Sequence, residues 1–108
     1  MIVVVFQVTM REGQEGRYFD LAAELRPELE RIDGFLSVER FASLATPGKY
    51  VSLSFWRDED AVRRWRAHGE HGVAQALGKR EIFADFRISV AQVVRDYTLA
   101  ERVGAVAG

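Results

Sequence analysis

The sequence contains no cysteine, which excludes disulfides, thiolate metal sites and a cysteine nucleophile. This absence fits a reducing compartment, and we expect a cytoplasmic protein. Long hydrophobic runs are also missing, because the longest apolar run, Ile2 to Phe6, is far too short to span a bilayer. The run lacks the basic front and the small-residue cleavage site of a signal peptide, so we expect no membrane partner.

No charge of one sign predominates. The 15 basic residues nearly balance the 16 acidic ones, and both kinds are spread along the chain. A basic patch of the kind that binds nucleic acid is therefore not expected. The 108 residues suit one domain. A chain this short buries roughly 60 to 65% of its unfolded surface, so a partner would add useful stability.

Four segments have the alternation or the β-branched content of strands, namely Ile2–Thr9, Phe35–Leu44, Tyr50–Trp56 and Phe86–Tyr97. The second and third are separated by Thr46-Pro47-Gly48-Lys49, which has the composition of a turn. These two segments are therefore expected to form a hairpin.

Two further segments have helical periodicity. From Gln14 to Ile32, apolar residues recur at every third or fourth position, and Gly34 follows as a stop. A second helix is expected to begin at Arg57–Asp60, where acidic side chains favour the helix dipole. Glycines interrupt this helix before a short helical stretch, Val73–Leu77.

The resulting order is βαββαβ, which with right-handed crossovers closes into a ferredoxin-like α+β fold with an antiparallel four-stranded sheet. We expect one domain over residues 1–97 and a tail or arm over residues 98–108. In this architecture both helices cover the same face of the sheet. The other face needs a partner if it is apolar, so a homodimer is predicted.

Alternation within the strands divides their side chains into two sets. We expect a uniformly apolar face that packs against a second copy, with Val4, Phe6, Leu53 and Phe55. We expect a mixed face beneath the helices that lines a polar-dotted cavity, with Gln7, Tyr50, Ser52, Ser54 and Trp56. The reverse assignment stays open, because alternation does not decide which face turns inward.

The segment from Phe55 to His71 contains both tryptophans and both histidines of the chain. A strand that ends in Trp56, an acidic helix start, Trp65 on that helix and then His68-x-x-His71 resemble the antibiotic biosynthesis monooxygenase family. The resemblance extends over nearly the whole chain, through Gly34-Phe35-Leu36, Arg87-Ile88-Ser89-Val90-Ala91 and Asp96-Tyr97.

This resemblance implies a dimeric α+β barrel with a pocket between helix and sheet in each subunit. It also implies oxygenation of an aromatic or polyketide-like molecule with no bound cofactor. In such chemistry a phenol or enol is bound as its anion and reduces dioxygen directly, so the protein supplies shape, hydrogen-bond donors and a base. The resemblance suggests Trp65 as pocket wall, Gln7 as amide donor, and His68 or His71 as proton acceptor.

Three other functions are considered. The haem-degrading members of the family take their iron ligand ten residues past the helix tryptophan, where this chain has Gln75, so haem chemistry is disfavoured. A non-catalytic ligand binder and a purely structural dimer with a closed pocket are the others.

For Trp65 the alternative role is ordinary core packing. His68 and His71 have no third ligand at matching spacing, so no metal site is expected.

Overall fold

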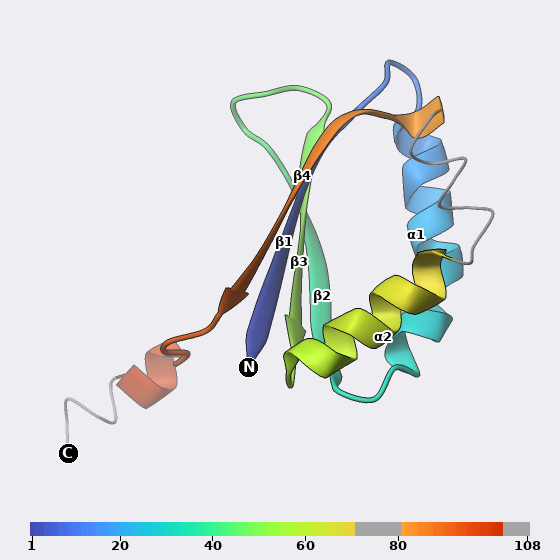
Figure 1. The fold of residues 1–108 in the computed structure, drawn as a ribbon. Coiled ribbons are helices and arrows are strands. Elements are labelled where there is room, and N and C mark those ends of the chain that lie inside the picture. Colours follow the sequence, from blue (N-terminus) through green and yellow to red (C-terminus); the bar gives the residue numbers. More distant parts are fainter. Residues whose placement is uncertain (71–80, 103–108) are drawn as a thin grey trace.

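A computed structural model describes residues 1–70 and 81–102 of the chain (Figure 1). Its elements are β1 (Ile2–Met10), α1 (Glu15–Glu30), β2 (Phe35–Ala42), β3 (Lys49–Trp56), α2 (Glu59–Glu70) and β4 (Phe83–Gln92). The predicted βαββαβ order is confirmed. The expected helical stretch Val73–Leu77 lies outside the described residues, and so does His71.

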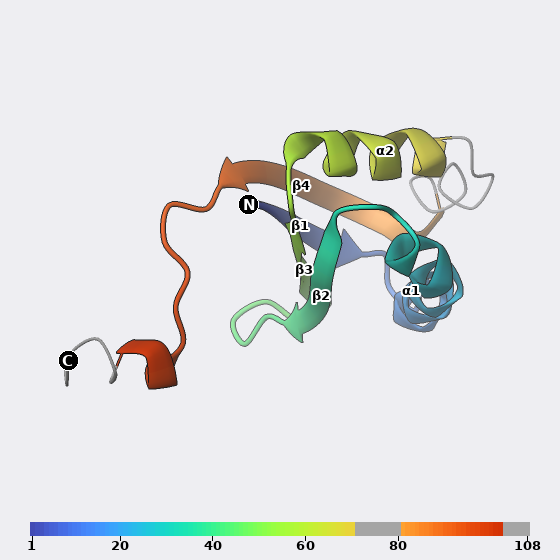
Figure 2. The ribbon, with the colours of Figure 1, turned by 90° about the horizontal axis from the view of Figure 1, so that it is seen from below.

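The four strands form one sheet in the order β2-β3-β1-β4, and every neighbouring pair is antiparallel. Both helices lie on the same side of this sheet, as Figure 2 shows. The predicted ferredoxin-like α+β fold is therefore confirmed. No helix in the described ranges is long and apolar enough to cross a membrane.

The β-branched strand β1 lies in the interior of the sheet, where its sequence IVVVFQVT pairs on both sides. Antiparallel partners that stand directly opposite project their side chains to the same face. Val4 stands opposite Ser54 and Val90, and Phe6 stands opposite Ser52 and Ile88. The helix-side face of the sheet therefore combines the apolar residues of β1 with the hydroxyl residues of β3.

The expected division into faces was therefore wrong. Gln7 stands opposite Val51 and Arg87, so its side chain lies on the open face, the face of the sheet that the helices do not cover. Ser52 and Ser54 lie on the helix-side face instead. Alternation divides the side chains of each strand into two sets on opposite faces. Only the register between neighbouring strands decides which sets share a face of the sheet. Val4 and Phe6 turn towards the helices, and Leu53 and Phe55 turn away from them.

The core consists of two separate clusters at opposite ends of β1. The Trp56 cluster contains the buried residues Ile2, Leu29, Trp56, Ala61 and Val62. The Val8 cluster contains the buried residues Val8, Met10, Tyr18 and Ile82. Helix α1 joins them, because its two buried residues are eleven positions apart, about 16 Å along a helix axis. Between the clusters, the middle of α1 faces the middle of the sheet.

The start of α2 is fixed by short contacts. The Asp58 carboxylate accepts a hydrogen bond of 2.9 Å from the Ala61 N–H, which caps the helix and lowers the pKa of Asp58 below its usual range. The Arg57 guanidinium donates two hydrogen bonds to Asp33, at 3.0 and 3.2 Å. This pair ties the α1–β2 connection to the start of α2, and it lowers the pKa of Asp33.

The final strand differs from its predicted range. β4 begins at Phe83 and ends at Gln92, whereas the sequence predicted a strand from Phe86 to Tyr97. After Gln92 the chain leaves the sheet and projects on the side opposite the helices (Figures 1 and 2). A capped helical turn follows, in which Thr98 and Glu101 exchange two hydrogen bonds of 3.2 Å. The domain boundary at residue 97 stays a prediction.

Gly34 lies in the connection between α1 and β2, close to the start of α2. Its φ is +96°, and an added Cβ would lie 2.6 Å from the Ala61 Cβ. We expect Gly34→Ala to lower the free energy of unfolding by about 2–5 kcal/mol, because left-handed strain of 1–2 kcal/mol adds to overpacking of 1–3 kcal/mol. Urea unfolding followed by circular dichroism measures this loss.

Gly13→Ala is the matched control for this prediction. Gly13 also has a positive φ, +79°, but no atom lies within 4 Å of the added Cβ. The control is expected to lose only the strain of about 1–2 kcal/mol. Equal losses in both variants would mean that the contact of the introduced Cβ with Ala61 does not lower the free energy of unfolding.

Candidate functional site

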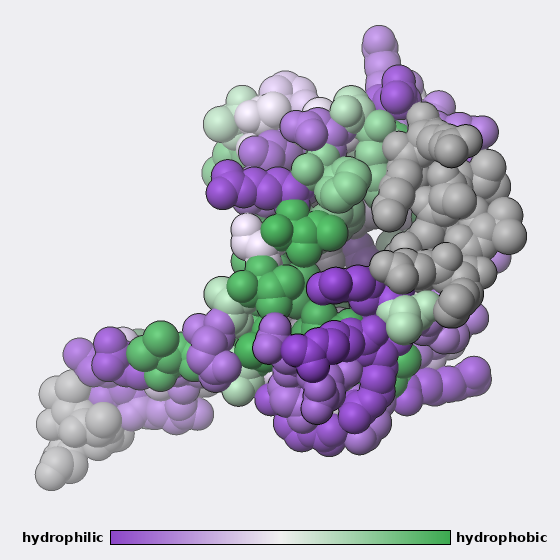
Figure 3. All heavy atoms as spheres, in the orientation of Figure 1, coloured by the Kyte–Doolittle hydropathy of each residue, from purple (hydrophilic) through white to green (hydrophobic). Residues whose placement is uncertain are grey.

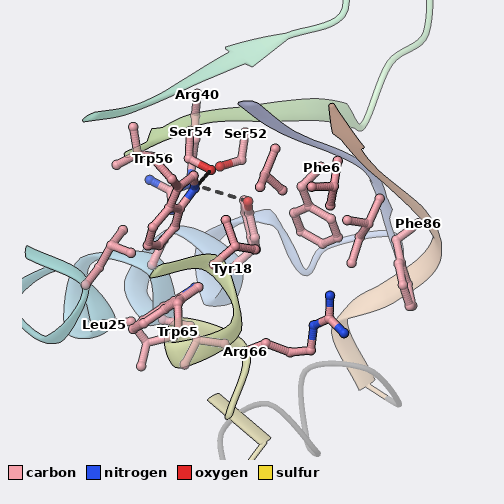
Figure 4. Close-up of a pocket in the computed structure, with 18 of the residues that line it drawn as sticks. Phe6, Tyr18, Leu25, Arg40, Ser52, Ser54, Trp56, Trp65, Arg66 and Phe86 are labelled. Atoms are coloured by element: carbon pink, nitrogen blue, oxygen red, sulfur yellow. Dashed lines mark hydrogen bonds between the residues drawn. The ribbon is translucent and has the colours of Figure 1, made fainter. Parts of the chain in front are cut away.

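A cavity of about 370 Å³ lies between the helices and the sheet (Figure 4). Its sheet wall includes Val4 and Phe6, which lie between the two core clusters on β1. Its helix wall includes Leu21 and Leu25 from the middle of α1. The cavity therefore occupies the space between the helices and the sheet that neither core cluster fills.

The cavity opens beside the edge strand β4. Three of its lining residues on this strand are strongly exposed for apolar side chains, Phe86 at 43%, Ile88 at 55% and Val90 at 41%. Figure 3 shows hydrophobic side chains gathered over β4 in the hollow beside α2. Because these exposed side chains also line the cavity, we expect a ligand to enter along this edge of the described sheet.

Trp56 forms the most buried part of the wall, with 2% of its surface exposed. Its indole Nε1–H donates a hydrogen bond of 2.9 Å to the Ser54 hydroxyl two residues earlier on β3. Phe35 packs edge-on against the indole at 5.4 Å between ring centroids. A buried indole N–H needs an acceptor, so Ser54 holds Trp56 in one orientation.

Trp65 on α2 is half-buried, packs against the Trp56 cluster and also lines the cavity. Its core and wall roles therefore coexist. The ring of His68 stacks on Trp65 with centroids 5.7 Å apart and planes 18° apart. His68 Nε2 lies 3.3 Å from the Glu28 carboxylate on α1, so the imidazole links the two helices outside the cavity.

Tyr18 and Arg40 form the polar contact that the sequence reasoning missed. The Arg40 Nε–H donates to the Tyr18 hydroxyl at 3.3 Å, and its guanidinium carbon lies 5.8 Å from the Tyr18 ring centroid. Both residues line the cavity, one from β2 and the other from α1 (Figure 4). The sequence did contain one signal. Arg40 comes two positions after Val38, so in a strand its cationic side chain shares a face with an apolar residue.

The structure brings together four of the predicted site residues. Ser52, Ser54, Trp56 and Trp65 all line the cavity. Their proposed roles toward a substrate stay predictions. The polar lining also includes Tyr18, Arg40 and Arg66, so the described wall has two cationic side chains and no acidic one.

The other predicted site residues lie elsewhere. Tyr50 packs edge-on against Phe19 at 5.1 Å beside the Val8 cluster, and it is absent from the described cavity wall. Gln7 projects from the open face of the sheet, and His68 turns towards Glu28. Gln7 therefore does not donate into this cavity, which corrects the expectation that it shares a face with Ser52.

A metal site finds no support in the described ranges. Within residues 1–70 and 81–102, no group of three or more His, Cys, Asp or Glu side chains is arranged to hold a metal ion. The polar groups of the described cavity wall are hydroxyls, guanidinium groups and two indole N–H groups, which act mainly as hydrogen-bond donors and are poor metal ligands.

The family model described as antibiotic biosynthesis monooxygenase matches residues 1–77. The chain belongs to this family. The resemblance predicted from the segment Phe55 to His71 is therefore confirmed.

Two curated relatives and one solved structure add detail. A jasmonate monooxygenase of Pyricularia oryzae is 42% identical over 93 residues, which are 86% of this chain and 43% of that protein. The chain thus spans less than half of that relative's length. The uncharacterized Bacillus subtilis protein YqjZ is 29% identical, covering 91% of this chain and 83% of its own.

The structure of SnoaB, a cofactor-independent oxygenase of Streptomyces nogalater, superposes with a TM-score of 0.73. It is 18% identical and covers 88% of this chain and 94% of its own. At this identity the similarity concerns the fold, and it agrees with the architecture described above.

The bond between Trp56 and Ser54 gives a testable prediction. Ser54→Ala leaves the indole N–H buried without an acceptor, so we expect the free energy of unfolding to fall by about 1–3 kcal/mol. Ser52→Ala is the control, because Ser52 lines the same cavity and its hydroxyl has no hydrogen bond to another described residue. This control should change stability by less than about 0.5 kcal/mol. Equal losses, measured by urea unfolding, would contradict the assigned bond.

Proposed function

We propose that this chain is a monooxygenase that oxygenates an aromatic or polyketide-like small molecule without a bound cofactor. The observation that carries the proposal is the cavity of about 370 Å³, which has apolar walls and a few donors in a domain of the antibiotic biosynthesis monooxygenase family. Small-molecule sites have roughly this size and this mixture of groups.

The chemistry needs little from the protein beyond binding and electrostatics. A ring CH₂ next to a phenol or enol is converted to C=O, one oxygen atom of O₂ enters the product and the other leaves as water with both hydrogens. The substrate supplies all the electrons. Donors that stabilise the substrate anion favour its reaction with dioxygen, and the described wall offers Ser52 and Arg66 as donors for this anion.

Trp65 is proposed as the flat wall against which the substrate ring packs. It lines the cavity and is supported on its other side by the Trp56 cluster. The predicted proton acceptor stays with His68 or His71, of which His68 stacks on Trp65. Jasmonate, for which the fungal relative is named, is the first natural substrate to test, because the enol of its cyclopentanone ring could react in this way.

We also propose that the chain works as a homodimer through the open face of the sheet. This face carries Val5, Val51, Leu53 and Phe55, and no helix of the described residues covers it (Figure 2). The segment after Gln92 projects on the same side and exposes Val94 at 82% and Leu99 at 81%. A second copy would bury both surfaces.

Oxygen uptake tests the proposed reaction. Anthrone, with one CH₂ between two rings, should consume one O₂ per molecule without added reductant or cofactor, above the rate with heat-denatured protein. Trp65→Phe is expected to lower kcat/KM by about tenfold or more, because the ring loses contact area. Arg63→Gln on the exposed side of α2 is the matched control and should keep the parent rate.

Full activity of folded Trp65→Phe would remove Trp65 from the proposed site, and no enzyme-dependent uptake with either anthrone or jasmonate would oppose a cofactor-free monooxygenase. Titration with haemin separates the haem alternative. The proposal predicts no Soret shift at equimolar haemin, whereas a saturable shift would favour haem chemistry.

Sedimentation equilibrium tests the homodimer. The proposal predicts twice the chain mass of 12.2 kDa. Leu53→Glu should shift the protein to one chain mass, because it places a charge in an apolar interface. Arg63→Glu on the solvent side of α2 introduces the same group and should leave the dimer intact. A parent protein that sediments as a monomer at all concentrations would refute this assembly.

A further inference from the structure

Arg40 is a half-buried cation at the β2 wall of the cavity. It stands opposite Ser52 in the register between β2 and β3, and both side chains line the cavity. Its Nε–H is used by the Tyr18 hydroxyl at 3.3 Å, and the guanidinium lies over the Tyr18 ring (Figure 4). Among the described residues, one of its five N–H donors has a hydrogen-bond acceptor, and the two terminal amino groups have none.

Arg40 lacks the ion pair that five other arginines have within the described residues. Arg17, Arg26, Arg57, Arg63 and Arg64 each have a carboxylate within ion-pair distance. Among the side chains that the structure describes, none places a carboxylate at Arg40. Residues 71–80 and 103–108 contain no aspartate or glutamate. A half-buried charge is costly unless a counter-ion accompanies it, and the described side chains provide none at Arg40, so this position favours an anion.

Tyr18 adds a second donor at the same place. Only 6% of its surface is exposed, and its oxygen accepts the hydrogen bond from Arg40. The hydroxyl hydrogen is therefore free to point away from Arg40, and a hydrogen bond accepted from a cation strengthens this donor. Guanidinium and phenol together present donors to one point of a largely apolar wall.

The position of this pair also limits the shape of the ligand. β2 and β4 are the two edges of the sheet, and the exposed apolar residues of the entrance lie on β4. Three strand spacings of about 4.8 Å separate these edges, roughly 14 Å in all. A ligand that reaches Arg40 from the entrance is therefore elongated, with an apolar body.

We propose that the substrate is an elongated apolar molecule with one carboxylate, and that Arg40 and Tyr18 bind this carboxylate. A single guanidinium with one phenol matches one negative charge, and the planar fork of Arg fits a carboxylate with two hydrogen bonds. This inference rests on the proposed function, since it names the substrate class of the same cavity. The carboxylate lies at the β2 end, and the reacting part lies towards Trp65 and the entrance.

Isothermal titration calorimetry tests the inference without turnover. The probes are 4-phenylbutyrate and its neutral analogue 4-phenylbutanamide, which have nearly the same shape. The parent protein should bind the carboxylate at least tenfold more tightly than the amide. Arg40→Gln should weaken the carboxylate at least tenfold and change the amide less than twofold, and Arg63→Gln should change neither.

Tyr18→Phe keeps the aromatic ring and removes only the hydroxyl. It should weaken the carboxylate about three- to tenfold while Arg40 remains, so it tests the same subsite even if Arg40→Gln fails to fold. Equal loss for both probes, or a parent protein with no preference for the carboxylate, would overturn the inference. Anthrone turnover that is unaffected by Arg40→Gln, together with such a result, would leave the monooxygenase proposal standing.

Discussion

The antiparallel register between β1 and β3 is the constraint on which the rest of the structure depends. It places Phe6 opposite Ser52 and Val4 opposite Ser54, so apolar and hydroxyl side chains share the face beneath the helices. A shift by one residue would exchange the two faces of β1 and remove Val4 and Phe6 from the cavity wall. The register therefore decides at once which residues line the cavity and which remain for a partner.

The cavity exists because the hydrophobic contacts are concentrated at two ends. Trp56, Leu29 and Val62 close one end, and Val8, Met10 and Tyr18 close the other. Helix α1 has one buried residue in each cluster, and it spans the interval without filling it. The bonds from Arg57 to Asp33 and from Ala61 to Asp58 fix the start of α2. These contacts keep Trp65 above the space between the clusters.

Much of the fold could be predicted from the sequence. Strand and helix periodicity gave the six elements in order, since each signal lies within its own segment. The division into faces was wrong because it depends on pairing between segments far apart in the chain, such as Gln7 with Val51. Similarly, the end of β4 at Gln92 follows from the length of its partner β1, which begins at Ile2. Local sequence does not contain this limit.

The candidate site was only partly predictable. Trp56, Ser52 and Ser54 follow from one strand and its alternation, and they line one cavity. The Arg40–Tyr18 contact joins a strand and a helix, and the two residues are 22 positions apart in the chain. Each side chain alone has an ordinary structural role. Tyr18 fits the apolar stripe of α1, and Arg40 fits a solvated strand. Only their convergence on the cavity distinguishes them.

Cysteine labelling tests the assignment of the two faces of the sheet most directly, because the natural chain has no cysteine and each variant carries a single thiol. In Ser52→Cys the thiol is expected in the cavity, and in Leu53→Cys on the open face. We expect 4-phenylbutyrate to slow maleimide labelling of Ser52→Cys only, and a higher protein concentration to slow labelling of Leu53→Cys only. Ligand protection of Leu53→Cys together with concentration dependence of Ser52→Cys would contradict the assignment of the two faces.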